Sequence, residues 1–405
     1  MLTKYWKNFS SISYKNIIDP LFFTVSIFLL QFLFWWLFFP DLPSVADGNN
    51  KYIGYTSFFL YLLLMLSFIL GGILGRGAAN SFSNDLYISN YSLFRWAKFS
   101  LVLTIIAFSF KFAQVLTKPD MIFDILNTGG VNRLAQGLNN TQTGIGFLSL
   151  FWIFPSGIFA FLFFSESNLK IKAKKYFYFT FLLVLFYSIL NMTRTAFITY
   201  FLINCCCYLF AKKIRIKITT LFMVIIFLLF FYWANSLLRT GILYSSTNNV
   251  GLFSFEVQAV LFQEFVEKYV AGEINNALIV MNHQADPLSN LLYGTAFHSF
   301  GNSYAINDYY LNTQNGFGFW YWQFGVLGSL VVVFLFSFTW RYSYFLAIRN
   351  YKLDYMHVSF LHYIFIFPGL YSITRINYFF LFYYLIPIFI IFIIIMFKIM
   401  FKRKA

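Results

Sequence analysis

The feature that most constrains this chain is a succession of long apolar segments that contain few charged residues. About ten stretches of roughly 17 to 25 mainly apolar residues follow one another between Leu21 and Phe397. A helix of that length crosses a hydrocarbon core of about 30 Å. Because a backbone exposed to lipid must satisfy its own hydrogen bonds, each segment is expected to be an α-helix. The pattern therefore predicts an integral membrane protein.

Composition and net charge agree with this interpretation. Hydrophobic residues make up 60% of the chain and charged residues 11%, whereas a soluble domain carries about 25% charged residues. A net charge of +15 in a soluble protein would suggest a nucleic-acid partner. Here the positive charges are sorted by side of the membrane, so we expect no nucleic-acid partner.

Most of the basic residues fall in alternate connections between the apolar segments. The positive-inside rule places such connections in the cytoplasm, so both termini are expected there and the number of spans is even. The basic segments are residues 4–15, 76–98, 170–175, 212–217, 341–352 and 398–404. The predicted spans are residues 20–39, 52–75, 97–116, 145–164, 176–191, 195–210, 217–236, 318–340, 357–374 and 376–397. The predicted fold class is an all-α polytopic membrane protein of about ten transmembrane helices.

Two connections on the less basic side are long. Residues 117–144 form the smaller loop, and residues 235–317 form a large loop between helices 7 and 8. Within the large loop, residues 255–271 have apolar positions at helical spacing with acidic residues between them, which predicts an amphipathic helix. A single dominant external loop favours a function on that side of the membrane.

The motifs of several enzyme classes are missing from the sequence. There is no Walker A or dinucleotide-binding glycine pattern, and no Asp-x-Asp pair of the kind that holds a metal in many nucleotide-sugar enzymes. No histidines or carboxylates have convincing metal-ligand spacing. We therefore expect neither a metal nor a cofactor.

Arginines on the external side are the first candidates for a binding site. Arg194 and Arg375 lie in tight connections between two spans, Arg239 follows span seven, and Arg133 lies in the smaller loop. Guanidinium groups with hydroxyl neighbours suit phosphate oxygens, because they offer a forked donor that is always charged. The alternative is that they extend to the interface or pair with external acids.

A histidine in the large loop is the first candidate for a catalytic base. His298 lies among glycines and small polar residues shortly before span eight. A neutral imidazole can accept a proton from a sugar hydroxyl near pH 7. His283 and the loop glutamates are alternative bases. His357 and His362 fall on the cytoplasmic side or within span nine and are interpreted as structural.

Two short motifs and the layout resemble a known family. Residues 193–197 read TRTAF, and residues 315–328 read NGFGFWYWQFGVLG, an aromatic and glycine-rich entry to the span after the large loop. With about ten spans and one dominant loop, the chain resembles the bacterial O-antigen polymerases. The related O-antigen ligases share the layout and carry a histidine late in the loop, which His298 would match, although the proline and asparagine that often surround it there are missing.

The resemblance implies a membrane glycosyltransferase of the bacterial inner membrane. Its substrates would be oligosaccharide repeat units linked to undecaprenyl pyrophosphate, reached from the periplasm, and a separate protein could regulate chain length. Arg194, helped by Arg375, Arg239 or Arg133, would hold the pyrophosphate, and His298 or a loop carboxylate would activate the acceptor hydroxyl.

Three alternatives stay open at this point. An O-antigen ligase would perform the same chemistry with a lipid A core acceptor. A lipid-linked oligosaccharide flippase or other transporter would place charged residues within the spans, as Lys111 does. A membrane acyltransferase would normally show a histidine paired with an acid, and no convincing pair is present.

Overall fold

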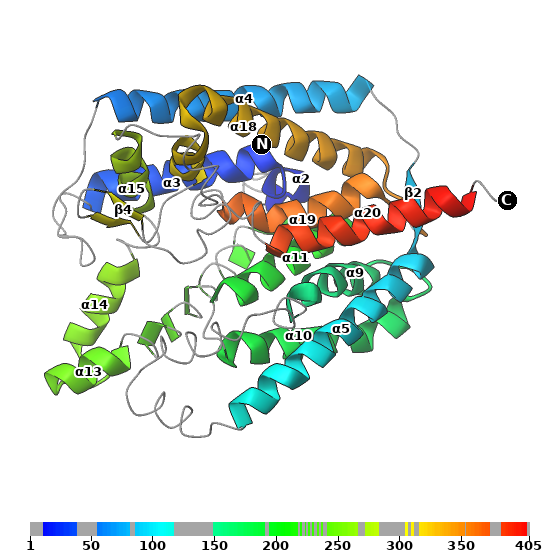
Figure 1. The fold of residues 1–405 in the computed structure, drawn as a ribbon, viewed down its shortest axis with the longest axis horizontal. Helices are drawn as coiled ribbons and strands as arrows, with labels where there is room; N and C mark the ends of the chain where they lie inside the picture. The colour runs from blue at the N-terminus through cyan, green and yellow to red at the C-terminus, as the bar shows by residue number, and fades with distance from the viewer. Residues whose placement is uncertain are drawn as a thin grey trace, which may run out of the picture.

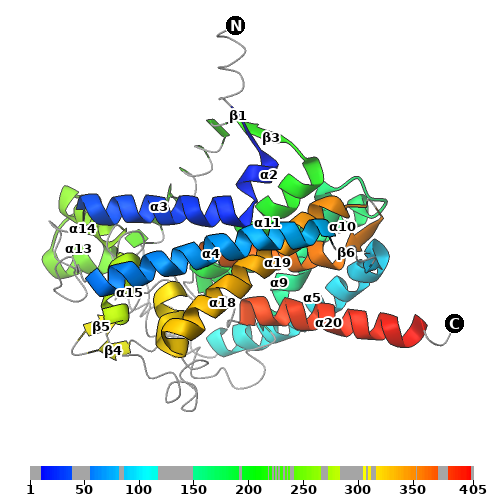
Figure 2. The same cartoon turned by 90° about the horizontal axis from the view of Figure 1, so that it is seen from above.

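The computed structural model is a bundle of helices with three short strand pairs (Figures 1 and 2). It describes residues 11–38, 55–81, 86–116, 149–190, 194–217, scattered positions between 219 and 237, 241–265, 272–282, 304–306, 309–311, 316–352, 354–372 and 382–402. Half of the positions in the predicted span at 217–236 lie outside these residues, and so does the whole of the smaller loop at 117–144.

The helices cover most of the other predicted spans. In chain order they are α2 (Tyr14–Ile17), α3 (Pro20–Phe38), α4 (Tyr55–Ser81), α5 (Asn90–Leu116), the 3₁₀ helix η1 (Ser149–Trp152), α9 (Ile153–Phe164), α10 (Lys170–Leu190), α11 (Arg194–Lys212), α13 (Ile242–Asn248), α14 (Phe255–Phe265), α15 (Gly272–Asn282), α18 (Gly316–Arg349), α19 (Val358–Ser372) and α20 (Phe382–Lys402). The strands are β1 (Ser11–Ser13), β2 (Tyr87–Ser89), β3 (Arg215–Lys217), β4 (Tyr304–Ile306), β5 (Tyr309–Leu311) and β6 (Tyr355–His357).

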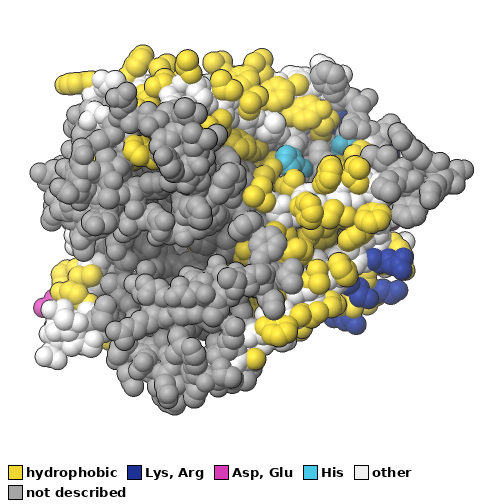
Figure 3. All heavy atoms as spheres, in the orientation of Figure 1, with side chains coloured by type: hydrophobic (Ala, Val, Ile, Leu, Met, Phe, Trp, Pro, Cys, Tyr) yellow, Lys and Arg dark blue, Asp and Glu magenta, His cyan; other side chains and the backbone are white. Residues whose placement is uncertain are grey.

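Several of these helices have the length and composition of membrane spans. Within the described residues, four helices are long and apolar enough to cross a membrane, namely those at Pro20–Leu37, Tyr55–Ser81, Asn90–Phe110 and Gly316–Arg349, and four shorter helices are also apolar. Many large apolar side chains on them are exposed, as lipid contact requires, and Figure 3 shows apolar side chains spread over much of the described face.

Two strand pairs join basic segments that are far apart in the sequence. β1 pairs with β3, and β2 pairs with β6, both antiparallel. The ammonium group of Lys213, beside β3, lies 4.3 Å from the ring centre of Tyr351, close to β6. Lys352 lies over the ring of Tyr87 in β2, and Lys398 donates to the carbonyl of Tyr87. The connections predicted to share one side therefore meet at one end of the bundle, which we call the basic end.

Helices α4 and α18 form the most extensive pair in the fold. An added Cβ at Gly71 would lie 2.3 Å from the carbonyl oxygen of Phe334, and one at Gly75 would lie 2.3 Å from that of Phe338. The second contact lies four residues after the first in both helices, so α4 and α18 run parallel. Two spans that both end at the basic end are expected to have this relative direction. Because glycine has no side chain, the backbones of α4 and α18 come into direct contact.

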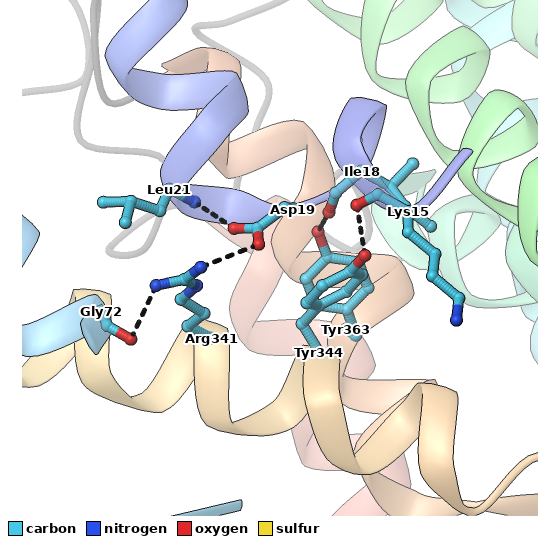
Figure 4. A network of polar contacts seen from close by, with 8 residues as sticks. All are labelled: Lys15, Ile18, Asp19, Leu21, Gly72, Arg341, Tyr344 and Tyr363. Atoms are coloured by element: carbon cyan, nitrogen blue, oxygen red, sulfur yellow. Dashed lines mark hydrogen bonds and ion pairs between the residues drawn. The ribbon is translucent and has the colours of Figure 1, made fainter. Parts of the chain in front are cut away.

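The start of α3 is fixed to the basic end by polar contacts (Figure 4). Asp19 accepts a hydrogen bond from the backbone N–H of Leu21 (2.9 Å) and pairs with the guanidinium of Arg341 in α18 (3.1 Å). Asp19 thus caps the helix that opens at Pro20, the position where proline is favoured. Tyr344 and Tyr363 donate to the carbonyls of Lys15 and Ile18.

Helix α18 is broken at Gly325 and does not form one straight span. Gly325 has φ 66° and ψ −170°, a backbone conformation open mainly to glycine. The ring of Trp320 stacks on that of Phe336 with centroids 5.2 Å apart, whereas a straight helix would separate these positions by about 24 Å. Residues 316–324 therefore fold back against the part that follows, 326–349, which is about 36 Å long and sufficient to cross the membrane. The sequence predicts a span at 318–340 and does not predict this break.

Part of the large loop is buried in the bundle. Helix α15 contacts α3, α4 and α18, and all but one of its residues from Ile274 to Met281 are buried. The buried Asn275 accepts a hydrogen bond from the indole N–H of Trp35 (3.3 Å). Helix α14 (Phe255–Phe265) covers the described part of the amphipathic helix predicted at 255–271, and residues 266–271 lie outside the described residues. It buries Val257 and Leu261 against Leu237 in a small separate core.

Candidate functional site

The candidate site is the folded-back segment at residues 316–324, which we call the half-helix. Its first aromatic ring, Phe317, stacks on Phe28 of α3 (4.7 Å between centroids) and meets Tyr61 of α4 edge-on (5.5 Å). Phe317 also lies 6.4 Å from Phe68, in the middle of α4. The half-helix is thus packed between α3, α4 and the long part of α18. In Figures 1 and 2 the first turns of α18 do not continue the line of the rest.

Two polar side chains of the half-helix are buried without hydrogen-bond partners. Gln323 has no solvent exposure, and within the described part of the chain neither its amide oxygen nor its amide nitrogen is hydrogen-bonded. The indole N–H of Trp320, three residues earlier on the same face, is likewise buried and unbonded. A buried polar group left without a partner costs about 1–3 kcal/mol. Such groups in a protein interior call for a specific explanation.

The chemistry of these two side chains suits a neutral polar ligand. Together they offer one indole N–H, an amide NH₂ group with two donors, and one amide oxygen as acceptor, with no formal charge. A sugar hydroxyl can both donate and accept, so it matches this set, whereas a pyrophosphate needs cationic partners. Irregular backbone at membrane depth occurs where it is buried in protein or lines a polar cavity, and broken helices often form substrate sites in membrane proteins.

Arg194 is the first residue of α11, and its backbone lies at the end of the bundle opposite the basic end. Helix α11 runs parallel to α9, because Tyr200 lies near Trp152 and Cys207 bonds to the carbonyl of Gly157. Helix α9 runs antiparallel to α19, as the ring pairs 154/365 and 161/360 show. The start of α11 and the end of α19 at Ser372 therefore share one end. The side chain of Arg194 is outside what the structure describes.

The other predicted site residues lie outside the described residues. These are His298 and Arg239 around the large loop, Arg375 after α19, and Arg133 in the smaller loop. His283 belongs to the same group. Their proposed roles stay predictions.

The two histidines that the structure describes are both hydrogen-bonded within the bundle. His362 joins three helices, with its Nδ1 2.8 Å from the hydroxyl of Ser343 in α18 and its Nε2 2.7 Å from that of Tyr384 in α20. The Nδ1 atom of His357 lies 2.6 Å from the hydroxyl of Ser359. These contacts fit the structural roles predicted for both. Among the described residues, no three His, Cys, Asp or Glu side chains gather as a metal site would require.

Sequence reasoning missed Gln323. The stretch 315–328 stands out as aromatic and glycine-rich, but an apolar run gives no sign that its one glutamine is enclosed. The available signal was a polar residue two positions before a glycine in a membrane segment, since intramembrane polar residues are costly and often functional.

The fold defines the class of this molecule as a helical membrane protein in which helix α18 folds back on itself at Gly325. No protein-family model matches the chain, and neither a curated protein nor a solved structure matches it.

Replacing Gln323 with leucine is expected to leave the protein as stable as wild type or more stable by about 1–3 kcal/mol, because the change removes an uncompensated buried amide. Asn275→Leu is the matched control. It removes an acceptor from Trp35 and should lower stability by about 1–3 kcal/mol. Thermal unfolding in detergent measures both. A clear loss of stability in Q323L would show that the amide serves the fold.

Proposed function

We propose that this protein is a glycosyltransferase that polymerises undecaprenyl-pyrophosphate-linked oligosaccharide repeat units at the periplasmic face of the bacterial inner membrane. The observation that carries the proposal is the half-helix, which holds an uncharged donor and acceptor pair inside the membrane domain. A substrate with a polar glycan on a lipid carrier fits a site of this kind, because the lipid can stay in the bilayer while the sugars enter the protein.

The distribution of charge supports placing the reaction on the periplasmic side of the membrane. The clustered lysines and arginines of the basic end favour the cytoplasm, so the opposite end faces the periplasm. The backbone of Arg194 and the end of α19, after which Arg375 follows, belong to that opposite end. A guanidinium group there would meet the pyrophosphate of a carrier lipid at the membrane surface.

The proposed reaction is a metal-independent displacement at an anomeric carbon. The acceptor hydroxyl of one lipid-linked unit attacks the anomeric carbon of the growing glycan, and His298 takes the hydroxyl proton. The bond to the pyrophosphate oxygen breaks, and undecaprenyl pyrophosphate leaves with the electron pair. Arg194, with Arg239, Arg375 or Arg133, stabilises the charge of the leaving group. Gln323 and Trp320 bind sugar hydroxyls, and a chain-length regulator is a possible protein partner.

A second candidate is a lipid-linked oligosaccharide flippase. Broken helices with buried polar groups also form the substrate sites of transporters, so the same half-helix favours it. An O-antigen ligase, which shares the chemistry, is the third.

The experiment that tests the proposal is a gel of lipopolysaccharide from a strain that lacks the gene, with and without the gene restored. A polymerase predicts a single repeat unit on the core, which extends to a full ladder on complementation. Core with no repeat unit would indicate the ligase or the flippase. An unchanged ladder would rule out all three.

In the same complementation assay, Arg194→Lys is expected to reduce polymer at least tenfold. Lysine keeps the charge but loses the forked pair of donors that binds two phosphate oxygens. His298→Ala should abolish the ladder if the imidazole is the base. Full activity in R194K would exclude the forked-donor role, and wild-type polymer in H298A would move the base to another residue. Protein levels in the membrane serve as the control.

A further inference from the structure

The starts of α5 and α10 meet at the basic end around one half-buried tyrosine. The ring of Tyr176 in α10 stacks on Phe159 of α9 with centroids 5.0 Å apart and an interplanar angle of 22°. Phe94 of α5 meets the same ring edge-on at 5.5 Å. This aromatic cluster fixes the position of Tyr176 between two helices that both start at the basic end.

Two lysines share that ring. The ammonium nitrogen of Lys175 lies 5.0 Å from the ring centre of Tyr176, and that of Lys98 lies 5.8 Å from it. Lys98 also lies 5.9 Å from the ring centre of Phe94. Both ammonium groups therefore lie beside the same tyrosine ring, one face of which is covered by Phe159. Two like charges are thus held close together by cation–π contacts.

The structure gives this pair of cations no acidic partner. Lys98 and Lys175 make no ion pair with any described residue, and Glu166 is the single acid in the described stretches 86–116 and 149–190. Further exposed cations surround them on the same two helices, namely Arg95, Lys170, Lys172 and Lys174. Figure 3 shows Lys and Arg side chains gathered at this end of the molecule.

Apolar surface continues from the lysine pair toward the middle of the same helices. Phe99 and Val102 on α5 are 56% and 52% exposed, and Phe179 and Leu182 on α10 are 44% and 60% exposed. Exposed apolar side chains next to a ring of cations are typical of the boundary between hydrocarbon and headgroups.

We propose that Lys98 and Lys175, held on Tyr176, form a binding site for the phosphate of an anionic phospholipid. The phosphate offsets the repulsion between the two ammonium groups, and its acyl chains lie on the exposed apolar faces of α5 and α10. This apolar continuation selects a lipid over free inorganic phosphate. The site lies at the basic end, apart from the half-helix, and does not depend on the proposed polymerase activity.

The test uses the purified full-length protein in nanodiscs of phosphatidylcholine, with and without added phosphatidylglycerol. The variant is K98Q/K175Q. The matched control is K213Q/K352Q, which removes the same charge from two lysines that lie over two different tyrosines at the same end, 4.3 and 4.1 Å from the ring centres. Lipid retained in native mass spectrometry and the shift in unfolding temperature caused by phosphatidylglycerol are measured.

Wild type and control are expected to retain phosphatidylglycerol and to be stabilised by it. K98Q/K175Q should bind phosphatidylglycerol at least tenfold more weakly, because each lysine near an anionic headgroup raises the affinity about fivefold. Its unfolding temperature in phosphatidylcholine alone should match wild type, which shows that it folds. Equal losses in variant and control, or no loss in the variant, would overturn the proposal. So would the same stabilisation by inorganic phosphate in phosphatidylcholine nanodiscs.

Discussion

Alanine at both Gly71 and Gly75 is expected to lower the free energy of unfolding by about 3 kcal/mol or more. Each added Cβ would lie 2.3 Å from a backbone carbonyl oxygen of α18. A carbonyl in a helix cannot turn aside as a side chain can, so α4 and α18 must move apart. Their close packing is then lost along the whole pair.

Gly77→Ala is the control for this prediction. Gly77 lies in the same helix, and an added Cβ there meets nothing within 4 Å. Alanine also favours helix over glycine by about 1 kcal/mol, so G77A should be neutral or stabilising. Thermal unfolding of the purified variants in one detergent gives the comparison. If G71A/G75A unfolds at the same temperature as G77A, the contact between α4 and α18 is wrong.

Alanine at Gly71 or Gly75 is also expected to displace the half-helix. Phe68 of α4 contacts Phe317 in the half-helix and Trp340 in the long part of α18. A displacement of α4 by about 1 Å shifts a wall of the candidate site, and catalytic sites tolerate such shifts poorly. G71A or G75A alone should therefore reduce polymer in the complementation assay more than the fall in protein level explains.

Asp19→Ala is expected to destabilise the protein by about 3 kcal/mol. The carboxylate has two partners, the backbone N–H of Leu21 and the guanidinium of Arg341. Loss of a helix cap costs about 0.5–2 kcal/mol, and removal of one member of a buried ion pair costs about 3–5 kcal/mol. The side chains are 11% and 13% exposed, so solvent reduces the second figure. After the change, Arg341 keeps its bond to the carbonyl of Gly72 (3.3 Å).

Three further variants separate the parts of this effect. Asp19→Asn keeps a capping oxygen and should lose less than D19A. The double-mutant cycle of Asp19→Asn with Arg341→Met measures the ion pair itself. Arg349→Met is the matched control, because Arg349 lies on the same helix and donates to the carbonyls of Ala79 and Asn80, with no acidic partner among the described residues. A loss in R349M as large as in R341M would argue that the pairing with Asp19 contributes nothing.

The membrane class and the helical segments follow from the sequence alone. Apolar length and the placement of lysines are local properties, and each span can be recognised without its neighbours. The sequence also predicted which basic segments share one side. The β1–β3 and β2–β6 pairs, with Lys213 over Tyr351, bring those segments together as expected. The candidate residues in the loops could be named from the sequence, but the described structure does not test them.

The tertiary structure decided the contacts between residues that are far apart in the chain. The fold-back at Gly325, the enclosure of Gln323 and the lysine pair on Tyr176 depend on which helices are neighbours, and an apolar helix carries little information about its partners. Asp19 and Arg341 are 322 positions apart, so no local pattern joins them. In lipid, helix pairing is set by shape and by a few polar contacts, because the hydrophobic effect that selects the spans is already satisfied by the bilayer.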